Sequence, residues 1–380
     1  MATAPALDLA ALVDDPATRI VVCCGSGGVG KTTTAAALGL AAAERGRRVV
    51  VLTIDPARRL AQSLGLTELD NTPRPVAGVD TAAGGSLDAM MLDMKRTFDD
   101  VVEQHASPDK AAQILANPFY QAVSSSFAGT QEYMAMEKLG QLRAEAEADG
   151  RWDLVVVDTP PSRSALDFLD APQRLGSFLD GRFIRMLMAP AKASGRAYLK
   201  VVSAGVTLAA QTMGRILGAQ MLADVQTFVA ALDTMFGGFR ERADATYALL
   251  AADETAFVVI ATPERDALRE AAFFVDRLDQ DGMPLAGLVV NRMQVLAAPG
   301  LSASRASAAA EALEDDGAHE HSVAMLRLHS RLAEVAARQQ AIVDRFVAGH
   351  PRIGVTQVPA ADQDIHDLDG LRSVGASLLG

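Results

Sequence analysis

Runs of apolar residues alternate with helix-like segments along most of the chain. Many of the runs have no polar interruption, which is typical of parallel strands buried on both faces. The predicted strands cover residues 19–24, 48–54, 87–92, 152–157, 257–261, 285–290 and 353–358. This alternation predicts an α/β fold with a mostly parallel central sheet that helices cover on both faces.

The helical segments divide the chain further. Residues 166–250 contain no strand signal, and their apolar residues recur at helical spacing. We therefore expect a helical insertion there, between a first part of the α/β core at 1–165 and a second part at 251–380. Other predicted helices cover 32–43, 93–148 with two interruptions, 264–280, 321–347 and 367–379, and residues 298–318 fit either a mobile loop or a short helix. Residues 1–18 look like a short lead-in, and the glycines and prolines of 71–86 predict a loop.

Composition and charge narrow the class of protein. Of the 380 residues 49% are hydrophobic, which is ample for one large or two ordinary cores. The formal net charge of −12 argues against a nucleic-acid partner, because non-specific binding needs clustered Lys and Arg. The longest weakly charged run, between Lys200 and Arg215, is too short to span a bilayer. With no visible signal peptide, we expect a cytoplasmic protein without stable membrane insertion.

The most specific motif lies between the first predicted strand and the first predicted helix. Residues 25–32 read Gly-Ser-Gly-Gly-Val-Gly-Lys-Thr and satisfy G-x-x-x-x-G-K-[ST] at every fixed position. The strand before the motif and the helix after it are the context that a phosphate-binding loop requires. Glycines in such a loop let main-chain amides surround an anion at the positive end of the helix dipole. The motif therefore predicts a nucleotide-binding site.

Each position of this loop has an expected task. The main-chain amides that would surround the phosphates belong to Gly27, Gly28, Val29 and Gly30. Lys31 is expected to bridge the β- and γ-phosphates, the Thr32 hydroxyl to hold Mg²⁺, and Thr33 to reach the α-phosphate.

Two aspartates follow predicted strands, at the sheet edge where groups acting on bound phosphates are expected. Asp158 ends an apolar run, as a Walker-B aspartate does, and is expected to hold Mg²⁺ through water. Asp55 follows the strand at 48–54 and is expected to orient the attacking water, so that Asp55 and Lys31 are the candidate catalytic residues. Either aspartate could instead be an N-cap or turn residue.

Together these motifs resemble the ArsA family of ATPases, which includes an arsenite-pump ATPase and an ATPase that delivers tail-anchored membrane proteins. The matching segments are residues 25–33, Ile54-Asp55-Pro56-Ala57 and Asp158-Thr159-Pro160-Pro161. The chain looks closest to the stand-alone actinobacterial ArsA-like ATPases. The resemblance implies a P-loop NTPase that hydrolyses ATP with Mg²⁺. It also implies a dimer that closes on ATP, with Asp55 in switch I and Asp158 opening switch II.

The resemblance also assigns residues that the motifs alone do not reach. It implies that Asn291 contacts adenine, although this residue could also be a strand-end turn residue. The segment 358–362, which contains Pro359, resembles a loop that packs on the base, and the segment 129–132 resembles a nucleotide-sensing segment. In the targeting ATPase of the family, helices like those of the insertion form a groove for a hydrophobic client. The methionines of this insertion could equally fill an ordinary helical core.

The chain departs from the family pattern in three ways. The family loop usually carries a second lysine, which reaches the partner's phosphates, where this chain has Ser26. Arg58, Arg59 or Arg163 could replace that cation, or a paralogue could supply it. The C-x-x-C zinc pair is absent, so zinc at a dimer interface is not expected. Arsenite sensing is not expected either, because Cys23 and Cys24 are the only thiols.

Three functions are open at this point. The first is a Mg²⁺-dependent ATPase whose homodimer, or heterodimer with an ArsA-like paralogue, opens and closes a partner-binding helical subdomain. The second is a nucleotide-binding regulatory subunit with little turnover that acts with a catalytic paralogue, an option that Ser26 keeps open. The third is a partitioning ATPase of the ParA or MinD kind. The acidic charge balance and the lack of a C-terminal basic amphipathic helix disfavour this third function.

Overall fold

The computed structural model of the chain describes residues 5–55, 59–118, 120, 121, 124, 130–160, 241–315 and 319–380. These residues form two compact units. The first unit takes in the described residues of 1–91, 149–165 and 250–380, and the second those of 92–148 and 166–249. Most of the predicted helical insertion at 166–250, with Arg163 just before it, lies outside the described residues, and the domain division made from the sequence stays a prediction.

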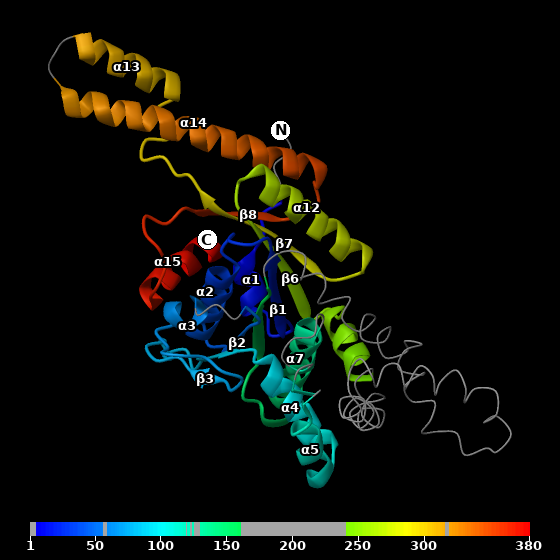
Figure 1. Ribbon diagram of the computed structural model, residues 1–380. Helices are drawn as coiled ribbons and strands as arrows, with labels where there is room; N and C mark the ends of the chain where they lie inside the picture. Colours follow the sequence, from blue (N-terminus) through cyan, green and yellow to red (C-terminus); the bar gives the residue numbers. More distant parts are fainter. Residues whose placement is uncertain are drawn as a thin grey trace, which may run out of the picture. The chain divides into compact units, whose positions relative to one another are not determined.

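An eight-stranded sheet forms the centre of the first unit (Figure 1). Its strand order is β3-β4-β2-β5-β1-β6-β7-β8, and every neighbouring pair is parallel except β3 with β4. In that order the strands cover Arg74–Pro75, Ser86–Met91, Arg48–Thr53, Leu154–Asp158, Ile20–Gly25, Thr255–Ala261, Leu285–Met293 and Val355–Pro359. The α/β prediction is therefore confirmed, and the two-residue strand β3 lies in a segment that we expected to be a loop.

The three central strands are buried along their whole length, as their apolar sequences predict. Every residue of β1, β5 and β6 is buried. Strand β1 pairs with β5 on one side and β6 on the other, so that Val21 lies beside both Val156 and Ala256. Full burial of a valine side chain is worth roughly 1.5–3 kcal/mol relative to exposure. This apolar centre fixes the two chain positions where β1 and β5 end, Gly25 and Asp158.

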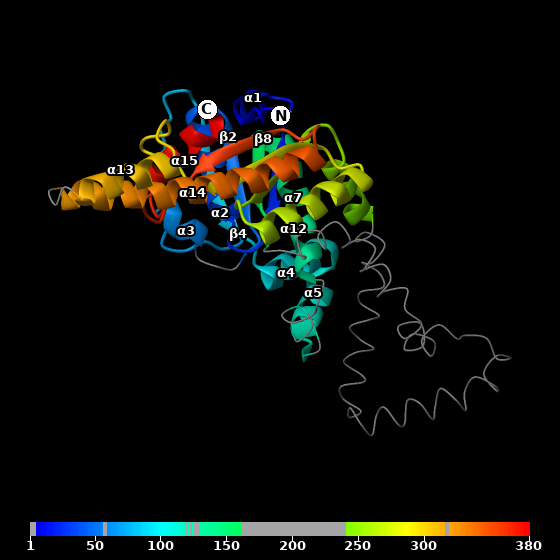
Figure 2. The same cartoon turned by 90° about the horizontal axis from the view of Figure 1, so that it is seen from above.

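Helices cover both faces of the sheet (Figures 1 and 2). On one face α2 (Lys31–Glu44) packs with α15 (Leu368–Leu379), and the short helix α1 (Leu9–Asp14) contacts both. On the other face α12 (Arg265–Gln280) contacts β1, β6 and β7. The short helix α3 (Arg59–Ser63) contacts α2. The buried side of α2 is rich in alanine, which lets this helix lie close to the sheet behind the predicted phosphate loop.

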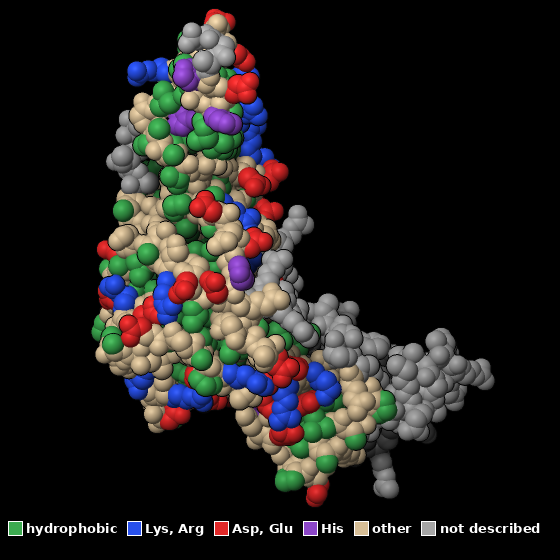
Figure 3. Space-filling model, turned by 90° about the vertical axis from the view of Figure 1, so that its left-hand side faces the viewer, with side chains coloured by type: hydrophobic (Ala, Val, Ile, Leu, Met, Phe, Trp, Pro, Cys, Tyr) green, Lys and Arg blue, Asp and Glu red, His purple; other side chains and the backbone are tan. Residues whose placement is uncertain are grey.

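A helical hairpin follows β7. Helix α13 (Ala303–Asp315) packs on α14 (Glu320–Gly349), and α14 also contacts α12 and β7 (Figure 1). Of the two options for residues 298–318, the helix is therefore the one present, in α13. Hydrophobic side chains lie on the surface of this hairpin (Figure 3). In α14, Met325 and Leu328 are 67% and 50% exposed.

The described part of the second unit is helical, as the sequence predicts. It contains α4 (Met94–His105), α5 (Pro108–Leu115), α7 (Thr130–Asp149) and a helical segment at 241–249. The proline at the start of α5 has no N–H to satisfy there, which explains the interruption between α4 and α5. Within the described segments of the chain, every helix is too short or too polar to traverse a bilayer.

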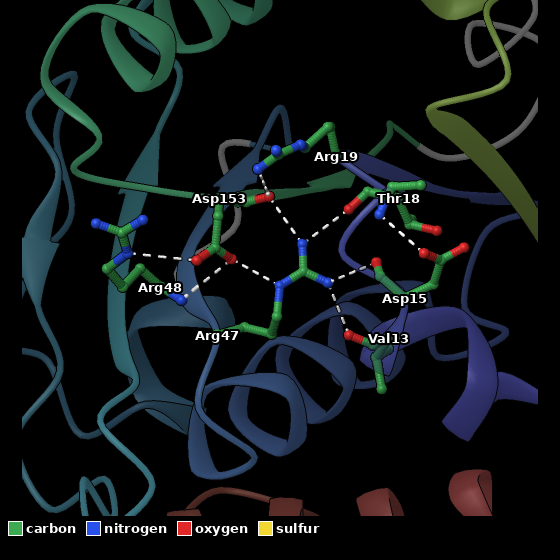
Figure 4. Close-up of polar contacts among 8 residues, drawn as sticks. Val13, Asp15, Thr18, Arg19, Arg47, Arg48 and Asp153 are labelled. Atoms are coloured by element: carbon green, nitrogen blue, oxygen red, sulfur yellow. Dashed lines mark hydrogen bonds and ion pairs between the residues drawn. The ribbon is translucent and has the colours of Figure 1, made fainter.

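One buried arginine joins three segments at the amino ends of the central strands (Figure 4). The guanidinium of Arg47 donates to the main-chain oxygens of Val13, Asp15 and Thr18 at 2.8, 2.9 and 2.8 Å. It also donates to the main-chain oxygen of Asp153 at 2.8 Å and to its carboxylate at 2.6 Å. All five of its N–H groups are therefore paired. This contact fixes the chain around α1, which the sequence suggested was only a lead-in.

Arg47→Met is expected to lower the free energy of unfolding by about 3 kcal/mol, because it removes the shorter of the two ion pairs of the Asp153 carboxylate and the guanidinium donors to the buried carbonyls of Val13 and Thr18. Urea denaturation would measure this loss. Arg48→Met is the matched control, because Arg48 is half exposed and contacts the same carboxylate at 3.3 Å. The control should change stability by less than about 1 kcal/mol. Equal losses of stability in the two variants would contradict the structural role given to Arg47.

Candidate nucleotide site

The predicted phosphate loop connects the buried end of β1 with the start of α2. Gly30 caps α2 with a φ of 99°, in the left-handed region where any residue with a Cβ is strained. A Cβ on Gly30 would also lie 2.3 Å from Nδ2 of Asn291, and a Cβ on Gly25 would lie 2.1 Å from the main-chain oxygen of Ile260. The geometry of this turn therefore requires both of the fixed glycines of the motif.

Lys31 is folded into this loop. Its Nζ donates to the main-chain oxygen of Ser26 at 2.9 Å, and the residue is only 6% exposed. Burial lowers the pKa of the Lys31 ammonium, an effect that the nearby charge of Asp158 partly opposes. Among the described residues no carboxylate forms an ion pair with this ammonium. A desolvated cation that contacts only a neutral carbonyl is well placed to attract an anion.

Asp158 is the most constrained acidic side chain of the site. It is fully buried at the end of β5, and its Oδ2 accepts hydrogen bonds from the hydroxyls of Thr32 at 2.7 Å and Thr53 at 2.9 Å. Its Oδ1 has no hydrogen-bond partner among the described residues. Burial raises the pKa of this carboxyl to about 6, against the opposing effect of the two threonine hydrogen bonds.

The residues around Asp158 fit a magnesium ion. Carboxylate, hydroxyl and water oxygens are the ligands that Mg²⁺ prefers. The buried Oδ1 is an acceptor that lacks a donor, which costs free energy unless a ligand, an ion or water satisfies it. The Thr32 hydroxyl donates its proton to Oδ2 and keeps its lone pairs for another contact. Asp158 and Thr32 would hold the ion.

Asp55 follows β2 at the same edge of the sheet. It lies close enough to Lys31 and Asp158 for its charge to raise the pKa of both. The main chain around it is fixed by Ile54, whose N–H donates to the main-chain oxygen of Asp158 at 3.0 Å. On the other side of Asp158, the Thr159 hydroxyl donates to the main-chain oxygen of Cys23 at 2.9 Å. The ends of β1, β2 and β5 thus bring both predicted aspartates to the loop.

The residues that the resemblance assigned to the base lie on β7 and β8. Nδ2 of Asn291 donates to the main-chain oxygen of Val29, inside the loop, at 2.9 Å. Pro359 ends β8 and lies opposite Met293 on β7. Met293 and Pro359 also line a cavity of about 630 Å³ that residues of α14 close on the other side. The structure therefore brings Asn291 to the phosphate loop, while Pro359 lines a cavity between β7, β8 and α14.

The other residues predicted for the site differ in exposure, and some of them lie outside the described residues. Gly27 and Gly28 are exposed, and Thr33 is half-buried in the first turn of α2. Arg59 begins α3, while Arg58 and Arg163 lie outside the described residues. Of the segment 129–132, only the main chain of 130–132, in α7, is described.

Two features of the site were not anticipated. The sequence marks Thr53 only as part of a strand, although a hydroxyl near the end of an apolar run, two residues before Asp55, is a usable signal. The cavity beside Pro359 depends on how α13 and α14 pack together as a hairpin. No local sequence pattern indicates that packing.

The two cysteines lie on β1 just before the loop. Both are free and buried on β1. Burial raises the pKa of the Cys24 thiol to about 12, and it raises the pKa of Cys23 as well. Because the thiolate is the reactive form, burial disfavours nucleophilic chemistry and soft-metal binding at both cysteines.

Comparison with known proteins agrees with this geometry. A family model described as an anion-transporting ATPase, ArsA_ATPase, matches residues 18–311. The arsenical pump-driving ATPase of Acidiphilium multivorum is 29% identical over 158 residues, which cover 41% of this chain and 26% of that protein. ATPase GET3 of Lachancea thermotolerans is 30% identical over 175 residues, covering 43% of this chain and 49% of that protein.

An uncharacterized protein of Streptomyces coelicolor is 32% identical over 202 residues, which cover 51% of this chain and 47% of that protein. The chain thus matches between about a quarter and a half of the length of these three relatives. The family model covers most of the chain, including the phosphate loop and every strand of the sheet except β8. The chain therefore belongs to the ArsA family of ATPases.

Proposed function

We propose that this chain is a Mg²⁺-dependent ATPase that acts as a dimeric switch. The observation that supports this best is the cluster at the carboxyl ends of β1, β2 and β5. There the buried Asp158 accepts hydrogen bonds from Thr32 and Thr53, next to a loop that encloses Lys31. The carboxylate oxygen that has no partner among the described residues is suited to bind Mg²⁺, which ATP hydrolysis requires.

Within this proposal, each residue has one task. The main-chain amides of 27–30 and the ammonium of Lys31 hold the phosphates, so Lys31 exchanges the Ser26 carbonyl for a phosphate oxygen. When bound, Mg²⁺ neutralises charge on the β- and γ-phosphates. Asp55 orients the attacking water, a task that suits a carboxylate following β2 at the same edge of the sheet as Asp158 and acting electrostatically on Lys31 and Asp158.

The dimer and the moving subdomain are the finer part of the proposal. The family resemblance implies a dimer that closes on ATP, and the exposed Gly27 and Gly28 leave the loop accessible to a partner subunit. A hydrophobic protein client would bind the helical insertion at 166–250. We place this cycle in the cytoplasm, since both cysteines are free thiols, as in a reducing compartment.

One observation favours a second function. Ser26 stands where the family loop usually carries a cation for the partner's phosphates, and in this structure its contribution to the loop is a main-chain carbonyl. A cation acting from a partner is worth roughly 10³–10⁵ in rate in other phosphoryl-transfer enzymes. The chain would then be a regulatory subunit with little turnover of its own, completed by a catalytic paralogue.

Phosphate release by the purified chain tests both functions. The ATPase proposal predicts continuous release from ATP with Mg²⁺ present and none after EDTA removes the metal. The regulatory function would be supported instead if the chain bound ATP tightly but released no phosphate until a paralogue was added. If the chain neither bound nor hydrolysed ATP, both proposals would be wrong.

A further inference from the structure

The contact between Asn291 and the phosphate loop has a role that base recognition does not require. Nδ2 of Asn291 donates to the main-chain oxygen of Val29 at 2.9 Å, across 262 residues of sequence. Val29 immediately precedes Gly30, the left-handed residue at which the loop turns into α2. A side chain that holds the Val29 carbonyl therefore fixes the peptide next to that turn.

The backbone of β7 is bent so that Asn291 can make this contact. Strands β7 and β8 pair in register up to Val290, and the ladder resumes only at Met293. Between them Arg292 has a φ of 62°, unusual for a residue with a side chain, and its N–H donates to Oδ1 of Asn291 at 2.9 Å. Bulges of this kind re-aim side chains next to functional sites.

Gly30 and the Asn291 side chain also lie close together. A Cβ on Gly30 would lie 2.3 Å from Nδ2 of Asn291, so the turn and the amide occupy adjoining positions with no room for an intervening group. The Asn291 amide therefore holds the loop by its direct hydrogen bond to the main-chain oxygen of Val29.

We propose that Asn291 is a positioning residue that holds the phosphate loop in its phosphate-binding conformation, independently of any contact with the base. The inference rests on the proposed nucleotide site and adds a role in binding the triphosphate itself. An amide carries two donor hydrogens and two acceptor lone pairs. One of each is used on Val29 and Arg292, so one of each stays available for a base.

Inorganic tripolyphosphate separates this role from adenine contact, because it has phosphates but no base. In Asn291→Ala the affinity for tripolyphosphate is expected to fall about tenfold, or about 1.4 kcal/mol, as for the loss of one hydrogen bond. Calorimetric titration of the full chain would measure it. Gln280→Ala removes an exposed amide at the end of α12 and should leave this affinity unchanged. Unchanged tripolyphosphate affinity in Asn291→Ala, with weaker ATP binding only, would overturn the proposal and leave the ATPase intact.

Hydrogen exchange distinguishes a local effect on the loop from a general loss of stability. In Asn291→Ala without ligand, amides of residues 27–32 should exchange faster while those of β6 keep their protection. Equal acceleration in β6 would mean that Asn291 supports the fold rather than the loop, and would contradict the proposal. If the unmodified chain bound neither tripolyphosphate nor ATP, the nucleotide site itself would be wrong, which is a separate result.

Discussion

Asp55→Asn is expected to lower the rate of ATP hydrolysis by about 10²–10⁴ while ATP stays bound. Loss of a side chain that orients and activates the attacking water typically costs this much. Asparagine keeps the size of the side chain but removes the charge that acts on Lys31 and Asp158. Single-turnover phosphate release and equilibrium binding of ATP would be measured on the same preparation.

The control for Asp55→Asn is Asp253→Asn, which makes the same change in net charge. Asp253 is exposed in the turn before β6, at the opposite end of the sheet from the loop. The control variant should hydrolyse ATP at the unmodified rate. Normal hydrolysis by Asp55→Asn would show that another group orients the water and that Asp55 is a turn residue.

Asp158→Asn is expected to reduce hydrolysis by at least about 10², with a higher Mg²⁺ concentration needed for half-maximal rate. The amide oxygen can still accept hydrogen bonds from Thr32 and Thr53, so the fold around β5 should persist. What the variant loses is the negative charge that would bind the ion. Initial rates over a magnesium titration, with circular dichroism as the check on folding, would measure both effects.

Thr53→Ser is the matched variant for this second prediction. It keeps the hydroxyl that donates to Asp158 and should leave the magnesium dependence close to normal. A magnesium titration of Asp158→Asn identical to that of the unmodified chain would contradict the role given to this carboxylate.

The sheet was predictable because its central strands are buried on both faces. Uninterrupted apolar sequences, such as residues 154–157 of β5, leave few other structures open to the chain. The partners of the buried Asp88 in β4 were not predictable in this way. Its carboxylate accepts the indole N–H of Trp152 at 2.9 Å and pairs with Arg151 at 3.0 Å. Such contacts depend on which segments become neighbours when the chain folds.

The phosphate loop was predictable for a different reason. Its glycines are required by backbone geometry, so their spacing is visible in the sequence itself. The bulge at Asn291 depends instead on how β7 pairs with β8, and the contact to Val29 joins segments far apart in the chain. The contact of Thr53 was equally unpredictable, because its partner Asp158 comes from another strand. Long-range pairing of this kind is not encoded in any local pattern.

Calorimetric titration of the chain with Mg-ATP tests the central claim most directly. The account predicts heat of binding from the unmodified chain and its loss in Lys31→Ala, which removes the only ammonium folded into the described loop. No heat from the unmodified chain, or equal binding by Lys31→Ala, would contradict it.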